Sequence, residues 1–103
     1  MFLGIDLGTS SIKAIVIDDD GNNIFESNQV LSISYPKPLW AEQDPFEWVE
    51  AAERAILKIP KKIRATLKGM GLSGQMHGAV LIDKQDKPIR PAILWNDGRS
   101  YQE

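Results

Sequence analysis

Apolar and polar positions alternate in short blocks at the start of the chain, and the blocks have the length of β-strands. Two apolar runs rich in Ile, Leu and Val flank the polar turn 8–11, a spacing typical of an antiparallel hairpin. A dense turn signal at 18–23 precedes a third run over 24–33. The pattern therefore predicts a three-stranded meander at the N-terminus.

A helical pattern follows a proline-containing extended stretch. Asp44 is expected as the N-cap, Pro45 at the first helical position and Glu47 as the partner of a capping box. Pro60 ends the helix. One face at helical spacing is expected to be core: Trp48, Ala52, Ala55, Ile56 and Ile59.

The loop before this helix holds Trp40 and Gln43, which are compatible with lining a pocket or with docking the loop. After the helix we expect strands over 67–73, 79–83 and 91–94. Glycines at 69 and 71 suggest a tightly approached backbone in the first of these. The order of elements predicts an α/β domain whose mixed sheet starts with a β-meander and is followed by a helix.

Composition narrows the class of protein. The chain has 103 residues, 43% hydrophobic and 25% charged, as expected for one small globular domain. A net charge of −2 without a basic stripe argues against nucleic acid as a partner, and no apolar run approaches a membrane span. The absence of cysteine excludes disulfides and thiolate metal sites and fits a reducing compartment. We therefore expect a soluble cytoplasmic protein.

The first hairpin carries candidate chemistry. Asp6 stands in an apolar strand, where an uncompensated charge is costly to bury. The turn offers an unhindered N–H at Gly8 and hydroxyls at Thr9 and Ser10, and Lys13 follows; such donors suit phosphate oxygens, while a nearby acid suits hydrated magnesium. An ordinary edge hairpin with a solvated Asp fits the pattern too. A P-loop is excluded, because the turn leads into a strand and not a helix.

Two further polar loops follow later strands. His77, the only histidine, lies between glycines and lacks the partners of a metal site, which leaves a solvated surface residue or a substrate hydrogen bond. The last strand ends in a cluster that could cover and hydrogen-bond a sugar or simply form a capped turn. That cluster consists of Trp95, Asn96, Asp97 and Arg99.

Read together, these motifs resemble a known family. Residues 4–13, Gly-Ile-Asp-Leu-Gly-Thr-Ser-Ser-Ile-Lys, are similar to the first phosphate motif of the sugar-kinase, Hsp70 and actin superfamily. With 38–45, 74–78 and 92–99 in the same order and approximate spacing, nearly the whole chain resembles the FGGY carbohydrate kinases, and most of all their xylulokinase branch. The resemblance implies the N-terminal part of an actin-like, ribonuclease H-like ATPase domain.

The resemblance also implies roles for individual residues. Asp6 would be the catalytic residue that organises Mg²⁺ beside the transferring phosphoryl group. ATP phosphates would contact Gly8, Thr9, Ser10 and Lys13. The sugar would contact Gln75, Met76, His77, Trp95, Asn96, Asp97 and Arg99. The reaction would move the γ-phosphoryl group of ATP to the C5 hydroxyl of D-xylulose, with ribulose, fuculose and gluconate left open as related substrates.

The chain departs from the family in length. Family members are several times longer, and their general-base Asp and adenine pocket have no counterpart here. We therefore expect residues 1–103 to be an N-terminal portion of kinase domain I that is inactive without the C-terminal domain. A homodimer without nucleic-acid or membrane partners is expected for the full-length enzyme. The alternative is a non-catalytic actin-like subdomain that binds phosphate or sugar weakly or self-associates.

Overall fold

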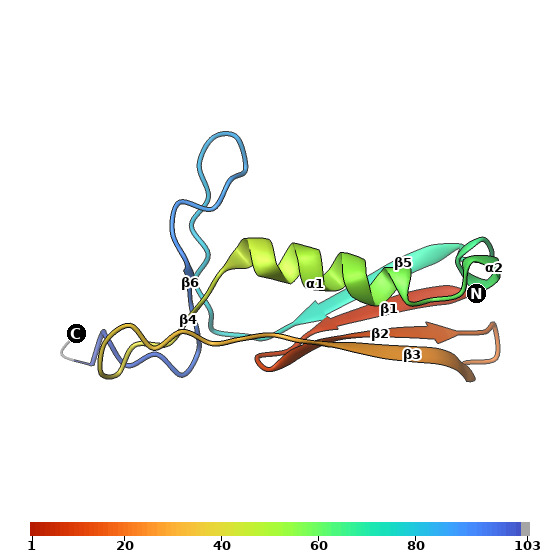
Figure 1. Cartoon of the computed structure of the whole chain (residues 1–103), viewed down its shortest axis with the longest axis horizontal. Coiled ribbons are helices and arrows are strands. Elements are labelled where there is room, and N and C mark those ends of the chain that lie inside the picture. The colour runs from red at the N-terminus through yellow and green to blue at the C-terminus, as the bar shows by residue number, and fades with distance from the viewer. Residues whose placement is uncertain (102–103) are drawn as a thin grey trace.

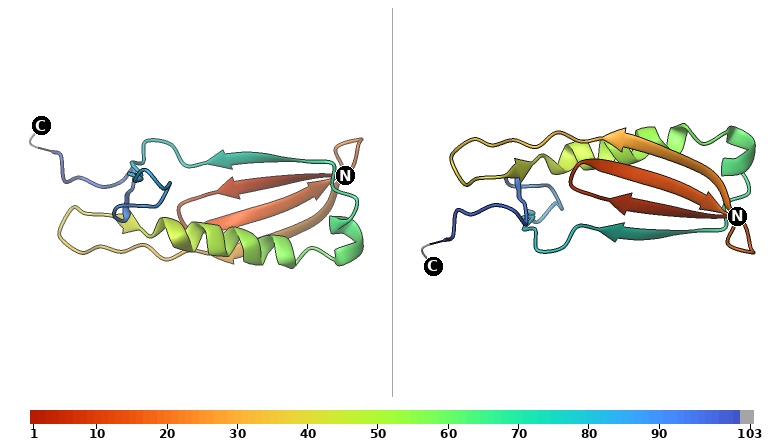
Figure 2. Two further views of the ribbon diagram at one scale, coloured as in Figure 1. Left: turned by 90° about the horizontal axis from the view of Figure 1, so that it is seen from above. Right: turned by 90° about the horizontal axis from the view of Figure 1, so that it is seen from below.

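A computed structural model describes residues 1–101, which form a four-stranded sheet with a helix on one face (Figures 1 and 2). The strands are β1 (Phe2–Leu7), β2 (Ser11–Ile17), β3 (Asn23–Val30) and β5 (Gly69–Gly74), in the order β3-β2-β1-β5. The first three are antiparallel neighbours, which confirms the predicted meander, and β5 pairs in parallel with β1.

Helix α1 (Pro45–Leu57) begins where the sequence predicted. The Asp44 side chain accepts a hydrogen bond from the Phe46 N–H at 3.0 Å. The predicted capping box is wrong, however, because the Glu47 carboxylate accepts hydrogen bonds from the backbone N–H and the hydroxyl of Ser32, at 3.2 and 3.3 Å. Glu47 therefore ties the helix start to the segment after β3 instead of capping its own helix.

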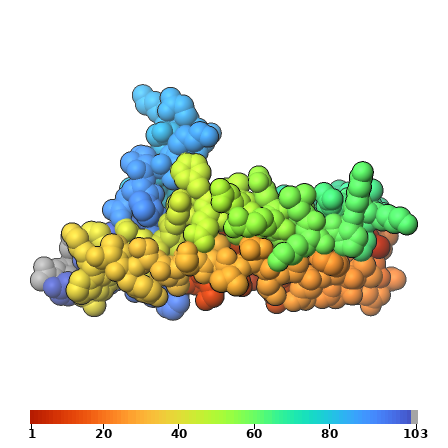
Figure 3. Space-filling view, in the orientation of Figure 1, coloured from red at the N-terminus to blue at the C-terminus, as the bar shows by residue number. Residues whose placement is uncertain are grey.

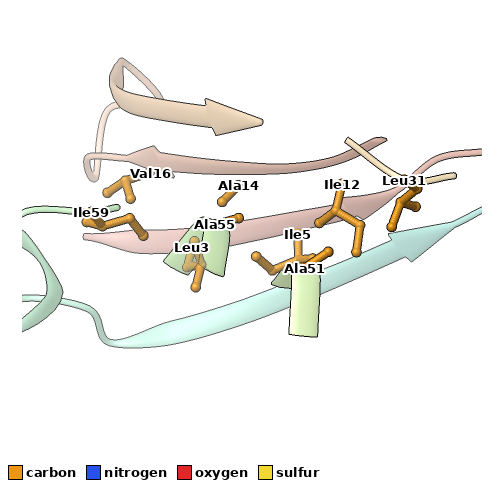
Figure 4. Packing of buried hydrophobic residues seen from close by; sticks show 9 residues of the cluster. All are labelled: Leu3, Ile5, Ile12, Ala14, Val16, Leu31, Ala51, Ala55 and Ile59. Atoms are coloured by element: carbon orange, nitrogen blue, oxygen red, sulfur yellow. The ribbon is translucent and has the colours of Figure 1, made fainter. Parts of the chain in front are cut away.

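The core lies between α1 and the sheet, where alternate residues of β1 and β2 point toward the helix (Figure 4). The helix contributes two fully buried small residues, Ala51 and Ala55, which let its backbone approach the strands closely. Ala51 was absent from the predicted face, and Trp48 lies only at the border of the core. Ser27 is buried on β3 and donates its hydroxyl to the Ala55 carbonyl at 2.9 Å.

Beyond the end of the main sheet, β4 (Glu42–Gln43) and β6 (Ala92–Ile93) form a small antiparallel pair. The short helix α2 (Lys61–Arg64) connects α1 to β5. The strand predicted over 79–83 is wrong, because this segment makes only isolated bridges. It belongs instead to a finger that protrudes from the body (Figures 1 and 3).

Strand β5 is the open side of the sheet. All six of its residues are exposed, and no further strand pairs with it among residues 1–101. The predicted close approach is not found: a Cβ added at Gly71 would meet nothing within 4 Å, and one added at Gly69 would only make ordinary contact with the Phe2 ring at 3.7 Å. The chain exposes 7047 Å², compared with about 5,800 Å² for a compact protein of this mass. The excess reflects an elongated body, 50 × 28 × 19 Å, with one uncovered sheet face and this uncovered edge.

Candidate functional site

The turn between β1 and β2 is tight. The Gly8 N–H donates to the Ser11 carbonyl at 3.0 Å, so it is not available to a phosphate in this arrangement, contrary to the sequence prediction. A Cβ added at Gly8 would lie 3.1 Å from the same carbonyl, closer than most side chains tolerate. Glycine is therefore required for the shape of the turn, which presents Thr9 and the exposed Ser10 at the end of the sheet.

Asp6 and Lys13 lie opposite each other on β1 and β2, and both face away from α1. Asp6 is exposed and accepts a hydrogen bond from the Ser73 hydroxyl at 2.6 Å. Lys13 Nζ lies 3.3 Å from Glu26 Oε1. A hydrogen bond from Asn23 and this contact with Lys13 lower the pKa of Glu26. Asp6, Lys13 and Ser73 line a shallow hollow of about 270 Å³ on the uncovered sheet face.

Asp6 fits the use of magnesium that the family resemblance implies. Mg²⁺ keeps several waters and is held by one or two carboxylates together with substrate phosphates. Residues 1–101 contain no group of three acidic, histidine or cysteine side chains that could hold an ion unaided. Asp6 is an exposed carboxylate beside the phosphate-type turn, so it matches a Mg²⁺ ion held by one carboxylate together with substrate phosphates and water.

The phosphate-type turn meets both predicted sugar segments at Thr9. Its hydroxyl donates to Gln75 Oε1 at 3.1 Å and accepts from Trp95 Nε1 at 3.0 Å. The Gln75 N–H also donates to the Leu7 carbonyl at 2.9 Å. Residues that are 66 and 86 positions apart in the sequence are therefore in direct contact.

The other predicted sugar residues divide into two groups. His77, Trp95, Asp97 and Arg99 line one hollow of about 580 Å³. Asn96 lines a different hollow of about 390 Å³, formed with residues 35–41. His77 has a φ of 59°, in the left-handed region that residues other than glycine seldom adopt. Met76 is 74% exposed and lines neither hollow.

Asp97 and Arg99 form a buried ion pair. The Asp97 side chain is 1% exposed, and its two oxygens accept four N–H groups, three from Arg99 and one from Ala41. Arg99 holds the pKa of Asp97 well below its usual range, and Asp97 in turn raises the pKa of Arg99. Arg99 also lies 3.8 Å from the centre of the Trp40 ring, so Trp40 docks its loop. Arg99 Nη1 is buried without a hydrogen-bond partner among residues 1–101.

Two buried residues of β4 have a larger part than sequence reasoning gave them: it left Gln43 as a pocket-lining or loop-docking residue and gave Glu42 no role. Glu42 is 6% exposed and pairs with Arg99 at 3.0 Å and with Arg90. Gln43 is 2% exposed and hydrogen-bonds to Thr9, to Gln75 and to two further residues. The available signals were the family-like stretch 38–45, which contains both residues, and the pairing of Gln43 with Trp40 in one loop. The contacts themselves could not be read from the sequence, because all these partners but Ser32 and Trp48 are distant along the chain.

The described helices show no membrane-crossing character. The longest in residues 1–101 is α1, with 13 residues, and none has the length and apolarity needed to span a bilayer.

Comparison with known proteins identifies the family. The model of the FGGY family of carbohydrate kinases, N-terminal domain, matches residues 1–103. The chain is 46% identical to the xylulose kinase of Escherichia coli (strain K12) and 48% identical to that of Klebsiella pneumoniae; each alignment covers 100% of the chain and 22% of the relative. The structure of a xyloylose kinase from Brucella ovis superposes with a TM-score of 0.96 at 48% identity, over 99% of the chain and 22% of that protein.

The chain thus spans about a fifth of the length of these relatives. Its mixed sheet and helix are the N-terminal part of the actin-like ATPase fold of these sugar kinases, as the family resemblance implied. The chain belongs to the FGGY family of carbohydrate kinases, and it matches the N-terminal domain of that family.

Proposed function

We propose that this chain forms the phosphate-binding and sugar-binding edge of a kinase that transfers the γ-phosphoryl group of ATP to the C5 hydroxyl of D-xylulose. The observation that carries the proposal is the Thr9 hydroxyl, which joins the turn to Gln75 and Trp95. Phosphoryl transfer depends on holding the donor phosphates and the acceptor hydroxyl in line, so the two sites must adjoin. Similarity to xylulose kinases favours D-xylulose over ribulose, fuculose or gluconate.

On the phosphate side, the Ser10 hydroxyl and the Lys13 ammonium supply the donors. Gly8 shapes the turn, and Thr9 connects it to the sugar side, since its hydroxyl hydrogen is already donated to Gln75. Asp6 would hold Mg²⁺, which would supply charge neutralisation at the transferring phosphoryl group.

On the sugar side, the 580 Å³ hollow supplies a mixed surface. Trp95 is 57% exposed and offers an apolar ring face. Arg99 Nη1 is buried and has no partner in residues 1–101, so a sugar hydroxyl in the hollow would satisfy it. Met76 and His77 lie at the same end of the molecule, and we keep both as proposed sugar contacts.

The general base lies outside this chain in our proposal. Asp97 is the acid nearest the sugar hollow, but its oxygens are occupied and its pKa is held well below the usual range. A carboxylate with so low a pKa is a weak proton acceptor. We therefore keep residues 1–103 as an N-terminal portion of domain I. The open β5 edge and the excess exposed surface support this assignment.

An assay of ADP release tests the proposal. The full product of the gene that encodes this chain is expected to phosphorylate D-xylulose with a higher kcat/KM than ribulose, fuculose or gluconate, and the 103-residue chain alone to show no turnover. His77→Ala should raise KM for the sugar and leave KM for ATP unchanged. A full product without sugar-dependent ADP release would refute the kinase, and an unchanged sugar KM in the variant would remove His77 from the site.

A second candidate function, self-association as a non-catalytic subdomain, is favoured by β5. Leu72 and Met70 are 74% and 59% exposed on this open strand. Exposed apolar edges of this kind pair readily with other strands. A homodimeric full-length protein and a cytoplasmic location stay predictions from the family resemblance.

A further inference from the structure

We infer that Gln43 is a positioning residue that fixes the phosphate turn relative to the sugar loop. The inference rests on the proposed kinase function, but Gln43 is not among the residues predicted to contact phosphate or sugar, and it comes from β4. Its side chain is buried at 2% exposure, between the turn 8–11, the loop after β5 and the start of α1. In this position it contacts the turn through Thr9 and the loop after β5 through Gln75, and it lines neither proposed hollow.

The Gln43 amide uses its full hydrogen-bonding capacity. Nε2 donates to the Thr9 carbonyl at 2.6 Å and to the Ser32 carbonyl at 3.3 Å. Oε1 accepts from Trp48 Nε1 at 3.0 Å and from Gln75 Nε2 at 3.3 Å. A primary amide has two N–H groups and two lone pairs, so each has a partner.

The chemistry of the partners allows only one direction for these bonds. An indole N–H can only donate, so Trp48 requires the oxygen of Gln43 on its side and directs the NH₂ group toward the two carbonyls. Gln75 must then turn its own NH₂ group toward Gln43 and its oxygen toward the Thr9 hydroxyl. A network with one possible proton arrangement and no unsatisfied member is rigid.

Rigidity at this point matters for the transfer reaction. Thr9 belongs to the phosphate turn, and Gln75 directly precedes Met76 and His77, which are two of the proposed sugar contacts. If Gln43 is disturbed, each ligand can still bind its own contacts, but the distance between them is no longer fixed. Misplacement of reacting groups by about 1 Å can lower a rate about 100-fold.

Gln43→Glu in the full gene product tests this role, because it keeps the size of the side chain and replaces two donors by an acceptor facing two carbonyls. We expect the single-turnover rate of phosphoryl transfer to fall about 10- to 100-fold, with the Kd values of ATP and D-xylulose changing by less than about threefold. Gln85→Glu is the matched control, since Gln85 is exposed on the finger and undergoes the same chemical change. The control should transfer phosphate at the wild-type rate.

Trp48→Phe keeps the inference testable should Gln43→Glu fail to fold. It removes the N–H that orients Gln43 and keeps an aromatic ring at the border of the core. We expect a smaller loss of rate than in Gln43→Glu, again with preserved Kd values. A wild-type protein without sugar-dependent transfer refutes the proposed function itself. An active wild type whose folded variants transfer phosphate within about twofold of its rate overturns the inference. A loss that only follows the folded fraction, measured by circular dichroism at the assay temperature, overturns it as well.

Discussion

Asp97→Asn should loosen the loop that carries Trp40, although the substitution changes only one atom of the side chain. In the wild type, Oδ1 accepts the Arg99 backbone N–H at 2.9 Å and Nε at 2.8 Å. Oδ2 accepts Ala41 N–H and Arg99 Nη2, both at 2.6 Å. The asparagine NH₂ group must replace one of these oxygens, so two N–H groups lose their acceptor whichever way the amide is turned.

The orientation that costs least places the NH₂ group at the Oδ2 position, because Arg99 Nη2 keeps Glu42 as a second acceptor at 3.0 Å. The Ala41 N–H then loses its acceptor, and Ala41 is only 2% exposed. A buried N–H without a partner costs about 1–3 kcal/mol. Since 1.4 kcal/mol is a factor of ten, protection of the Ala41 amide should fall about 5- to 150-fold.

Hydrogen–deuterium exchange of the 103-residue chain, resolved at the Ala41 amide, measures this effect locally. Amides in the middle of α1 serve as an internal reference for global opening, and they should exchange at the wild-type rate. Asp20→Asn is the control variant, because Asp20 is an exposed turn residue that loses the same charge. An Ala41 exchange rate that rises by less than about twofold would refute our account of how Asp97 is satisfied.

Three further outcomes follow from the same contacts. Arg99 holds the pKa of Asp97 below the reference value of 3.8, so the contribution of this ion pair to stability should be complete above about pH 5 and be lost progressively as the pH falls below that. Near-UV circular dichroism can follow the loss. Glu26→Gln releases Lys13 from an exposed pair that is worth about 0.2–1 kcal/mol, so KM for ATP in the full gene product should fall up to about fivefold if Lys13 binds phosphate. Leu72→Lys should reduce self-association of the 103-residue chain in sedimentation experiments, whereas a chain that is already monomeric would argue against the open edge as a contact surface.

The sequence predicted best those features that neighbouring residues determine. The hairpin around the turn 8–11 and the start of α1 at Pro45 depend on local spacing, turn residues and a cap, all of which one sequence displays. Pro60 likewise separates α1 from α2. The capping box failed because a competitor from another segment, Ser32, binds Glu47.

The candidate site was predicted in its parts but not in its connections. The resemblance placed Thr9, Gln75 and Trp95 in separate motifs, and only the fold brings them into hydrogen-bond contact. Gln43 and Glu42 could not be recognised as central, because their buried partners come from distant parts of the chain and no local pattern marks such contacts. The 79–83 segment failed for a related reason. Its apolar run has strand character, but its pairing is limited to isolated bridges, from Ala79 to Ile93 and from Ile82 to Pro88.

The pairing of β5 with β1 also has a consequence for the order of folding. Strands β1, β2 and β3 are joined by short turns, but β5 aligns Gly69 with Phe2, across most of the chain. Closing a long loop costs entropy before its contacts form, so we expect the meander to form first and β5 to dock late. Asp6 would then sit in a formed hairpin before Ser73 reaches it. Substitutions that delay β5 docking, even near residue 69, would therefore slow formation of the hydrogen bond between Ser73 and Asp6, although Asp6 lies in the hairpin that forms first.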